Sequence, residues 1–205
     1  MAVLLPFDVA SSPGPGRKPE VFFLAPVAAR ASISQDHFAL FGLPLSYSVD
    51  EGALDAAYRK LQSVVHPDRF ASAAEPERRR ALQASARVNE AYRVLKDPVE
   101  RAQYLLSLNG IEALSETDTS LPLDFLEGQL ERREAIAEAA EQRDSGALDA
   151  LQREIRAQAR ELEARLASEL DSKATLSDAR TTVRKLKFLS KLVADIDSTY
   201  VQIED

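Results

Sequence analysis

The stretch Val65-His66-Pro67-Asp68-Arg69 ends one predicted helix and shortly precedes another. Pro67 disfavours helical backbone at His66 and has no amide proton to donate, so the first helix ends here. Its buried face is predicted from apolar spacing of three and four residues, at Leu54, Ala57, Tyr58, Leu61 and Val65. After Pro76, which suits a first helical turn, the same spacing returns at Leu82, Ser85, Val88, Asn89, Tyr92 and Leu95. The sequence therefore predicts two helices joined by a loop that displays His66, Pro67 and Asp68.

Composition favours an all-α protein and argues against several classes of function. Of the 205 residues 45% are hydrophobic and only 7 are glycine, while β-branched stretches are few. The formal charge of −7 argues against general nucleic-acid binding, which needs a clustered basic face. With no cysteine and only His37 and His66, no metal site and no cofactor are predicted. No apolar run has the length that a membrane-spanning helix needs.

The chain divides into four segments. Residues 1–35 have turn and linker composition and are expected to form a disordered extension. Residues 36–110 contain the two helices and their loop, residues 111–121 are a polar connector, and residues 122–205 hold three further helical patterns. The sequence therefore predicts two helical domains behind an extension.

Short helices are predicted at both ends of the first domain. The first covers residues 36–41, with His37 expected at its solvent edge, and ends at Gly42, which can adopt the left-handed conformation that closes a helix. Asp50 is a candidate cap for the long helix that follows. Asp97-Pro98 caps and starts another short helix.

The second domain is predicted to be a three-helix bundle. Its helical patterns run over residues 122–143, 147–170 and 176–203. The breaks at Ser145-Gly146 and Asp171-Ser172 are short, so neighbouring helices are expected to be antiparallel in an up-down-up arrangement. Each helix alone is marginal in water, and the bundle supplies the apolar burial.

The first domain resembles a J-domain, the module through which co-chaperones contact a DnaK-class chaperone and stimulate its ATP hydrolysis. The elements that carry the resemblance are Tyr58-Arg59-Lys60-Leu61, His66-Pro67-Asp68, Arg69-Phe70 and Asn89-Glu90-Ala91-Tyr92-Arg93-Val94-Leu95-Lys96-Asp97-Pro98. The resemblance implies that His66, Pro67 and Asp68 make the decisive contact, in which the aspartate engages an arginine of the chaperone. A surrounding basic face suits an acidic partner; it comprises Arg59, Lys60, Arg69 and the three arginines 78–80. Two interpretations compete with this one. The loop could be a plain surface turn, or His66 could be a general base, although no nucleophile or metal accompanies it.

The first helix of the bundle carries a row of carboxylates at four- and three-residue spacing: Glu127, Glu131, Glu134, Glu138 and Glu141. Like charges at this spacing repel one another on a helix. Leu126 and Leu130 lie beside the row. An apolar pair bordered by acids fits a groove for a basic segment, whereas leucines of an ordinary helix belong to the core, and the residues alone favour neither interpretation.

The whole stretch from Asp36 to Ile203 is similar to the HscB family, J-type co-chaperones of iron–sulfur cluster assembly. The motifs are Asp36-His37-Phe38-Ala39-Leu40-Phe41-Gly42-Leu43-Pro44, Glu100-Arg101-Ala102-Gln103-Tyr104-Leu105-Leu106, Phe125-Leu126-Glu127-Gly128-Gln129-Leu130-Glu131-Arg132-Arg133-Glu134 and Val183-Arg184-Lys185-Leu186-Lys187-Phe188-Leu189. The resemblance implies an L-shaped pair of domains, of which the bundle binds the scaffold IscU and the J-domain contacts the chaperone HscA. The implied scaffold-binding positions are Leu126, Leu130, Glu131, Glu134, Glu138 and Phe188.

Positions 127 and 188 and the absence of cysteine refine what this resemblance implies. Glu127 stands where the best-known members carry an apolar methionine. Phe188 lies just off the core rows of Leu186 and Leu189, so its partial exposure is expected. Eukaryotic members add a cysteine motif for zinc that this chain lacks, so a bacterial cytoplasmic protein is favoured over one of the mitochondrial matrix. Without thiolates the chain lacks the usual cluster ligands, and the clusters are expected to stay with the scaffold.

Two other classes compete with this interpretation. A general J-domain co-chaperone in protein folding shares the His-Pro-Asp loop but binds unfolded chains. An enzyme is disfavoured, because the sequence has no glycine-rich phosphate loop, metal constellation or nucleophile–base pair.

Overall fold

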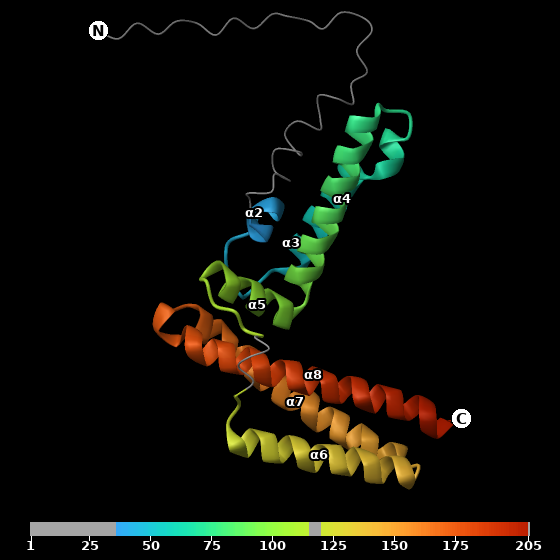
Figure 1. Cartoon of the computed structure of the whole chain (residues 1–205), viewed down its shortest axis with the longest axis vertical. Helices are drawn as coiled ribbons and strands as arrows, with labels where there is room; N and C mark the ends of the chain where they lie inside the picture. The colour runs from blue at the N-terminus through green and yellow to red at the C-terminus, as the bar shows by residue number, and fades with distance from the viewer. Residues whose placement is uncertain (1–35, 115–119, 205) are drawn as a thin grey trace, which may run out of the picture.

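The computed structural model describes residues 36–114 and 120–204, and every regular element in these ranges is helical, which confirms the predicted all-α fold. The elements are α2 (His37–Phe41), α3 (Glu51–Val65), η1 (Pro67–Phe70), α4 (Glu75–Lys96), α5 (Pro98–Leu108), α6 (Leu123–Glu141), α7 (Ser145–Leu170), η2 (Lys173–Thr175) and α8 (Leu176–Glu204). Figure 1 shows the predicted L shape, in which α3 and α4 rise away from a bundle of α6, α7 and α8. The predicted extension 1–35 lies outside the described residues.

The first arm is the predicted helical hairpin of α3 and α4. Leu54, Leu61 and Val65 point inward from α3 and are buried. Tyr58 of α3 stacks on Tyr92 of α4, with ring centroids 4.0 Å apart. Apolar burial and ring stacking thus fix α3 against α4 and hold the loop between them at the far end of the arm.

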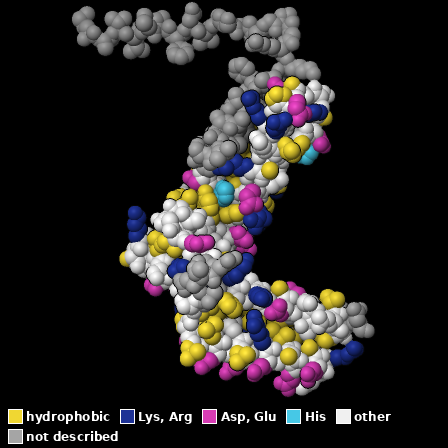
Figure 2. All heavy atoms as spheres, in the orientation of Figure 1, with side chains coloured by type: hydrophobic (Ala, Val, Ile, Leu, Met, Phe, Trp, Pro, Cys, Tyr) yellow, Lys and Arg dark blue, Asp and Glu magenta, His cyan; other side chains and the backbone are white. Residues whose placement is uncertain are grey.

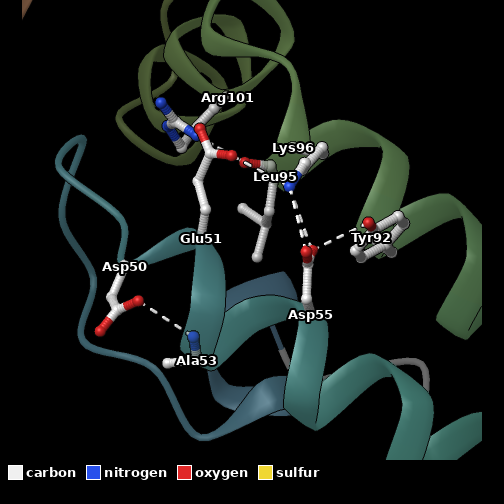
Figure 3. A network of polar contacts seen from close by, with 8 residues as sticks. All are labelled: Asp50, Glu51, Ala53, Asp55, Tyr92, Leu95, Lys96 and Arg101. Carbon is white, nitrogen blue, oxygen red and sulfur yellow. Dashed lines mark hydrogen bonds and ion pairs between the residues drawn. The ribbon is translucent and has the colours of Figure 1, made fainter.

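Polar contacts close the other end of the hairpin (Figure 3). The Lys96 ammonium lies 3.0 Å from the Glu51 carboxylate and 3.1 Å from that of Asp55. The Tyr92 hydroxyl donates to Asp55 at 2.9 Å. These bonds, chiefly the one from Lys96, hold the pKa of the Asp55 carboxyl below its usual value. The side chain of Asp50 accepts from the α3 backbone, so the predicted cap is present.

Several predicted side-chain positions are wrong, among them Asn89, which was expected on the buried face of α4 but is exposed. Leu82 was expected on the buried face of α4 but is 60% exposed, because the small residues Ala81 and Ala84 take the inward positions. His37 was expected at the solvent edge, but its ring stacks on Tyr104 with centroids 4.1 Å apart. Burial lowers the pKa of His37.

The second arm is the predicted up-down-up bundle, in which α7 lies along α8 and α6 packs on both (Figure 1). Its buried core includes Ile136, Leu148, Ile155, Leu162, Leu166, Val183, Leu186, Leu189, Leu192 and Ile196. The break after α6 differs from the prediction, since Ser145 and Gly146 belong to α7. Arg143 makes the turn instead, in the left-handed conformation with φ 51°. Asp144 then caps α7 by accepting from the Ala147 amide at 3.0 Å.

The two arms join where α5 packs against α7 and α8. The Arg101 guanidinium of α5 is buried 5.1 Å above the Tyr47 ring and donates to the Leu95 carbonyl at 2.6 Å (Figure 3). Burial raises the pKa of Tyr47 to about 12. Burial also raises the pKa of Glu163, which approaches this group from α7. The junction is therefore a packed interface that fixes one arm relative to the other.

Two arginines of α8 hold the segment that connects the arms. Arg180 Nε donates to the Glu112 carbonyl at 2.9 Å. The buried Arg184 donates from Nε to the Ala113 carbonyl at 2.8 Å and from Nη1 to the Ser120 carbonyl at 3.3 Å. Backbone carbonyls of the connector thus find donors on α8, which ties both ends of the connector to the bundle.

Candidate functional site

The His-Pro-Asp loop is built by the end of α3 and the single turn η1. His66 terminates α3 with extended backbone (φ −57°, ψ 127°), as expected for a residue before proline. Pro67 opens η1, and the buried Phe70 anchors its other end. The Arg69 guanidinium donates to the Ser63 carbonyl at 2.6 Å and so ties the loop back to α3. The loop is held from both sides although its central residues face solvent.

The two polar side chains of the loop face each other and stay accessible. His66 Nδ1 lies 3.5 Å from a carboxylate oxygen of Asp68, and the two side chains are 53% and 89% exposed. The backbone amide of Asp68 lies 3.4 Å from the same ring nitrogen and points its proton at it. The Asp68 carboxylate therefore presents acceptor oxygens to solvent, which suits it to a guanidinium from another protein.

The basic face around this loop is smaller than the sequence predicted. Arg59 and Lys60 are exposed on α3. At the start of α4, however, Glu75 pairs with Arg78 and lies 3.6 Å from Arg79. The carboxylate partly neutralises that arginine cluster, while Arg59, Lys60 and Arg69 remain exposed around the loop.

The surface of α6 reverses the usual placement of side chains. Gln129 is buried at 5% exposure, whereas Leu126 is 38% and Leu130 is 60% exposed. The interpretation of these leucines as core residues is therefore wrong. An exposed apolar row beside a buried amide is an informative departure from ordinary helix patterning. The carboxylates predicted at positions 131, 134 and 138, and Glu127 with them, are also exposed.

Phe188 of α8 keeps part of its side chain exposed, as predicted. It is partly buried and meets the buried Phe125 edge-on, with ring centroids 6.4 Å apart. Leu123, one turn before Leu126, is 70% exposed and was missed by the sequence analysis. Its three-residue spacing to Leu126 was the signal that could have identified it. Figure 2 shows hydrophobic side chains on the lower arm with acidic ones along its edge.

The part of the chain that the structure describes contains neither a metal-binding cluster nor a membrane-spanning helix. No group of three or more histidine or acidic side chains there is placed to hold a metal ion. No helix among these residues is long and apolar enough to cross a membrane.

Comparison with known proteins assigns a class to each arm. Residues 36–104 match the model of the DnaJ domain, and residues 121–197 match that of the HSCB C-terminal oligomerisation domain. The helical hairpin with its exposed His66-Pro67-Asp68 loop therefore belongs to a J-domain co-chaperone.

Individual relatives narrow the class to one family. A co-chaperone protein HscB homolog of Cupriavidus taiwanensis is 48% identical, over 84% of this chain and 98% of the relative. The solved structure of the chaperone HscB from Vibrio cholerae is 37% identical with a TM-score of 0.73, over 82% of this chain and 99% of that one. The crystal structure of the human co-chaperone protein HscB is 27% identical with a TM-score of 0.76, over 94% and 96%. The chain belongs to the HscB family.

Proposed function

We propose that this protein is an adaptor in iron–sulfur cluster assembly that brings the scaffold IscU to the DnaK-class chaperone HscA. The α6 face with Phe188 binds the scaffold, and the His66-Pro67-Asp68 loop stimulates ATP hydrolysis by the chaperone. The observation that carries the proposal is the inverted surface of α6, which buries Gln129 and exposes Leu130 in a chain that also displays an exposed Asp68. Membership in the HscB family supports both halves.

At the loop, the protein acts as a conformational effector. Asp68 offers a carboxylate to an arginine of the ATPase domain, a charge-assisted bond whose strength depends on the geometry of the pair. Pro67 limits the freedom that the loop must lose on binding. Arg59, Lys60 and Arg69 orient the encounter with an acidic surface. Hydrolysis speeds up only if these contacts are stronger in the hydrolysis-competent state of the chaperone.

At the bundle, apolar contact supplies affinity and carboxylates supply orientation. Leu126, Leu130 and the edge of Phe188 exclude water from the contact. Glu131, Glu134 and Glu138 select a partner segment that carries Lys or Arg. This acid-bordered face fits a folded, specific partner better than the varied unfolded chains that a general J-domain co-chaperone binds.

Joining both contacts in one rigid chain makes the second binding event effectively intramolecular. Its effective concentration is then set by the fixed distance between the arms. The clusters stay on the scaffold, since this chain has no cysteine to hold them. We place the activity in the bacterial cytoplasm, which bacterial relatives such as that of Cupriavidus taiwanensis support.

The test is the steady-state ATPase rate of HscA with this protein, with IscU, and with both. We expect stimulation by this protein and a more than additive rise when IscU is added. Failure to stimulate HscA contradicts the chaperone half of the proposal. Calorimetric binding of a denatured model substrate but not of IscU contradicts the scaffold half and favours a general folding co-chaperone.

A further inference from the structure

Leu123 continues the exposed apolar row of α6 by one turn toward the start of the helix. Leu123, Leu126 and Leu130 are 70%, 38% and 60% exposed. Their three- and four-residue spacing places them on one side of the helix, over a length of about 10 Å. Within residues 36–114 and 120–203, no other large hydrophobic side chain has a higher exposed fraction than Leu123.

The fold of the bundle does not need this leucine. Leu121, two residues earlier, packs against the core, and Phe125, two residues later, is buried against Phe188. Leu123 occupies the first position of α6, directly after Pro122, where a polar or acidic side chain suits the helix at least as well. Its apolar surface therefore stays in water in the isolated protein and is available to a partner.

The charges beside the row indicate the chemistry of that partner. Glu127 lies one turn after Leu123, and Glu134 lies one turn after Leu130, so exposed carboxylates border one edge of the row. Arg133 follows Leu130 by three residues on the opposite edge. A complementary segment carries apolar side chains along its centre, with Lys or Arg on the side that faces the carboxylates.

We propose that Leu123 is a third apolar anchor for the scaffold protein, so that the binding surface extends to the very start of α6. The inference rests on the proposed scaffold-binding function. The contacting segment of the scaffold spans two helical turns of this row and carries basic side chains toward Glu127 and Glu134. Because Glu127 interrupts the apolar area one turn later, Leu123 supplies the apolar contact at that end of the surface.

Calorimetric titration of IscU into the full chain tests this with Leu123→Ala and Leu123→Glu. We expect Leu123→Ala to raise Kd about fivefold to tenfold, and Leu123→Glu to raise it further. Both variants keep the thermal unfolding midpoint of the parent, because the side chain is exposed at a helix start. Leu45→Ala is the matched control: Leu45 is 62% exposed but lies on the other arm, and its substitution leaves Kd unchanged.

Four outcomes separate the two proposals. Parental affinity of Leu123→Ala together with weakened binding by Leu126→Ala overturns the inference and leaves the scaffold-binding surface in place. Parental affinity of both variants contradicts the surface itself. If Leu45→Ala weakens IscU binding as much as Leu123→Ala does, the inference is overturned, because any exposed leucine then has the same effect. Loss at Leu123 and Leu126 but not at Leu45 supports the extended row.

Discussion

The tip of the α3–α4 hairpin and the outer face of α6 lie on different arms and have opposite chemistry. At the tip, five consecutive residues present one carboxylate, 89% exposed, beside basic side chains of α3. On α6, leucines spread over two turns are bordered by carboxylates, with Phe188 added from α8. In the proposed function, the tip therefore depends on a single side chain in a rigid turn, whereas the α6 face shares its contacts among several. One substitution should abolish the function of the tip, but only reduce that of the face.

The largest effect is expected from Asp68→Asn, which tests whether the tip depends on this one carboxylate. The substitution keeps the shape of the side chain and removes its charge. We expect loss of HscA stimulation by about tenfold or more, because the amide cannot replace a charge-assisted pair with a guanidinium. The residue is exposed, so the circular dichroism spectrum and the affinity for IscU should stay those of the parent. A folded variant that still stimulates HscA would refute the role of this carboxylate.

Removing two apolar contacts at once tests the other arm. Leu126→Ala combined with Phe188→Ala should raise the Kd for IscU by about tenfold to a hundredfold, as buried apolar area is lost from the contact. Stimulation of HscA without IscU should not change. Because Phe188 also packs on Phe125, the unfolding midpoint must be measured alongside. Unchanged calorimetric affinity would exclude this face as the scaffold site.

A single acidic residue should matter less than the leucines. Glu134→Gln is expected to weaken IscU binding about twofold to fivefold at low salt and hardly at all at high salt, since exposed charges are screened. The effect should fall mainly on the association rate, measured by stopped flow. Glu161→Gln, an exposed carboxylate on α7, is the control. If Glu134→Gln still weakened IscU binding at high salt, Glu134 would instead make a contact that is buried in the complex.

The smallest expected effect concerns the polar network that closes the hairpin (Figure 3). The bond from Lys96, with that from Tyr92, lowers the folded-state pKa of Asp55. Asp55 therefore contributes stability above its unfolded pKa, and this contribution is lost as the pH falls through the lowered folded pKa. The substitution Lys96→Met should remove most of this pH-dependent contribution to stability.

The measurement is the thermal unfolding midpoint at a series of pH values from about 6 to about 3. The parent should lose more stability than Lys96→Met over this acidic range, while stimulation of HscA and binding of IscU near neutral pH stay unchanged. If the unfolding midpoints of the parent and of Lys96→Met fell in parallel with pH, the network would not lower the pKa of Asp55.

Much of the fold, and the loop that displays Asp68, were predictable because their sequence signals are local. The stop at Pro67 and the caps at Asp50 and Asp97 act within one helical turn, and the structure confirms them. Leu82 misled the sequence analysis because Ala81 and Ala84 allow α4 to approach its neighbours closely, which leaves the larger residue outside. The turn at Arg143 was missed because a left-handed conformation is rare at a residue other than glycine.

By itself the sequence determined the helices, their order, and the loop that displays Asp68, since periodicity, proline and capping residues act over a few positions. Only the tertiary structure decided which side of α6 faces solvent. That choice depends on α7 and α8, which cover Phe125 and Gln129 and leave Leu123, Leu126 and Leu130 in water. It also decided how the arms and the connector pack, because Arg101 reaches the Tyr47 ring and Arg184 reaches the Ala113 carbonyl only after distant segments have packed together.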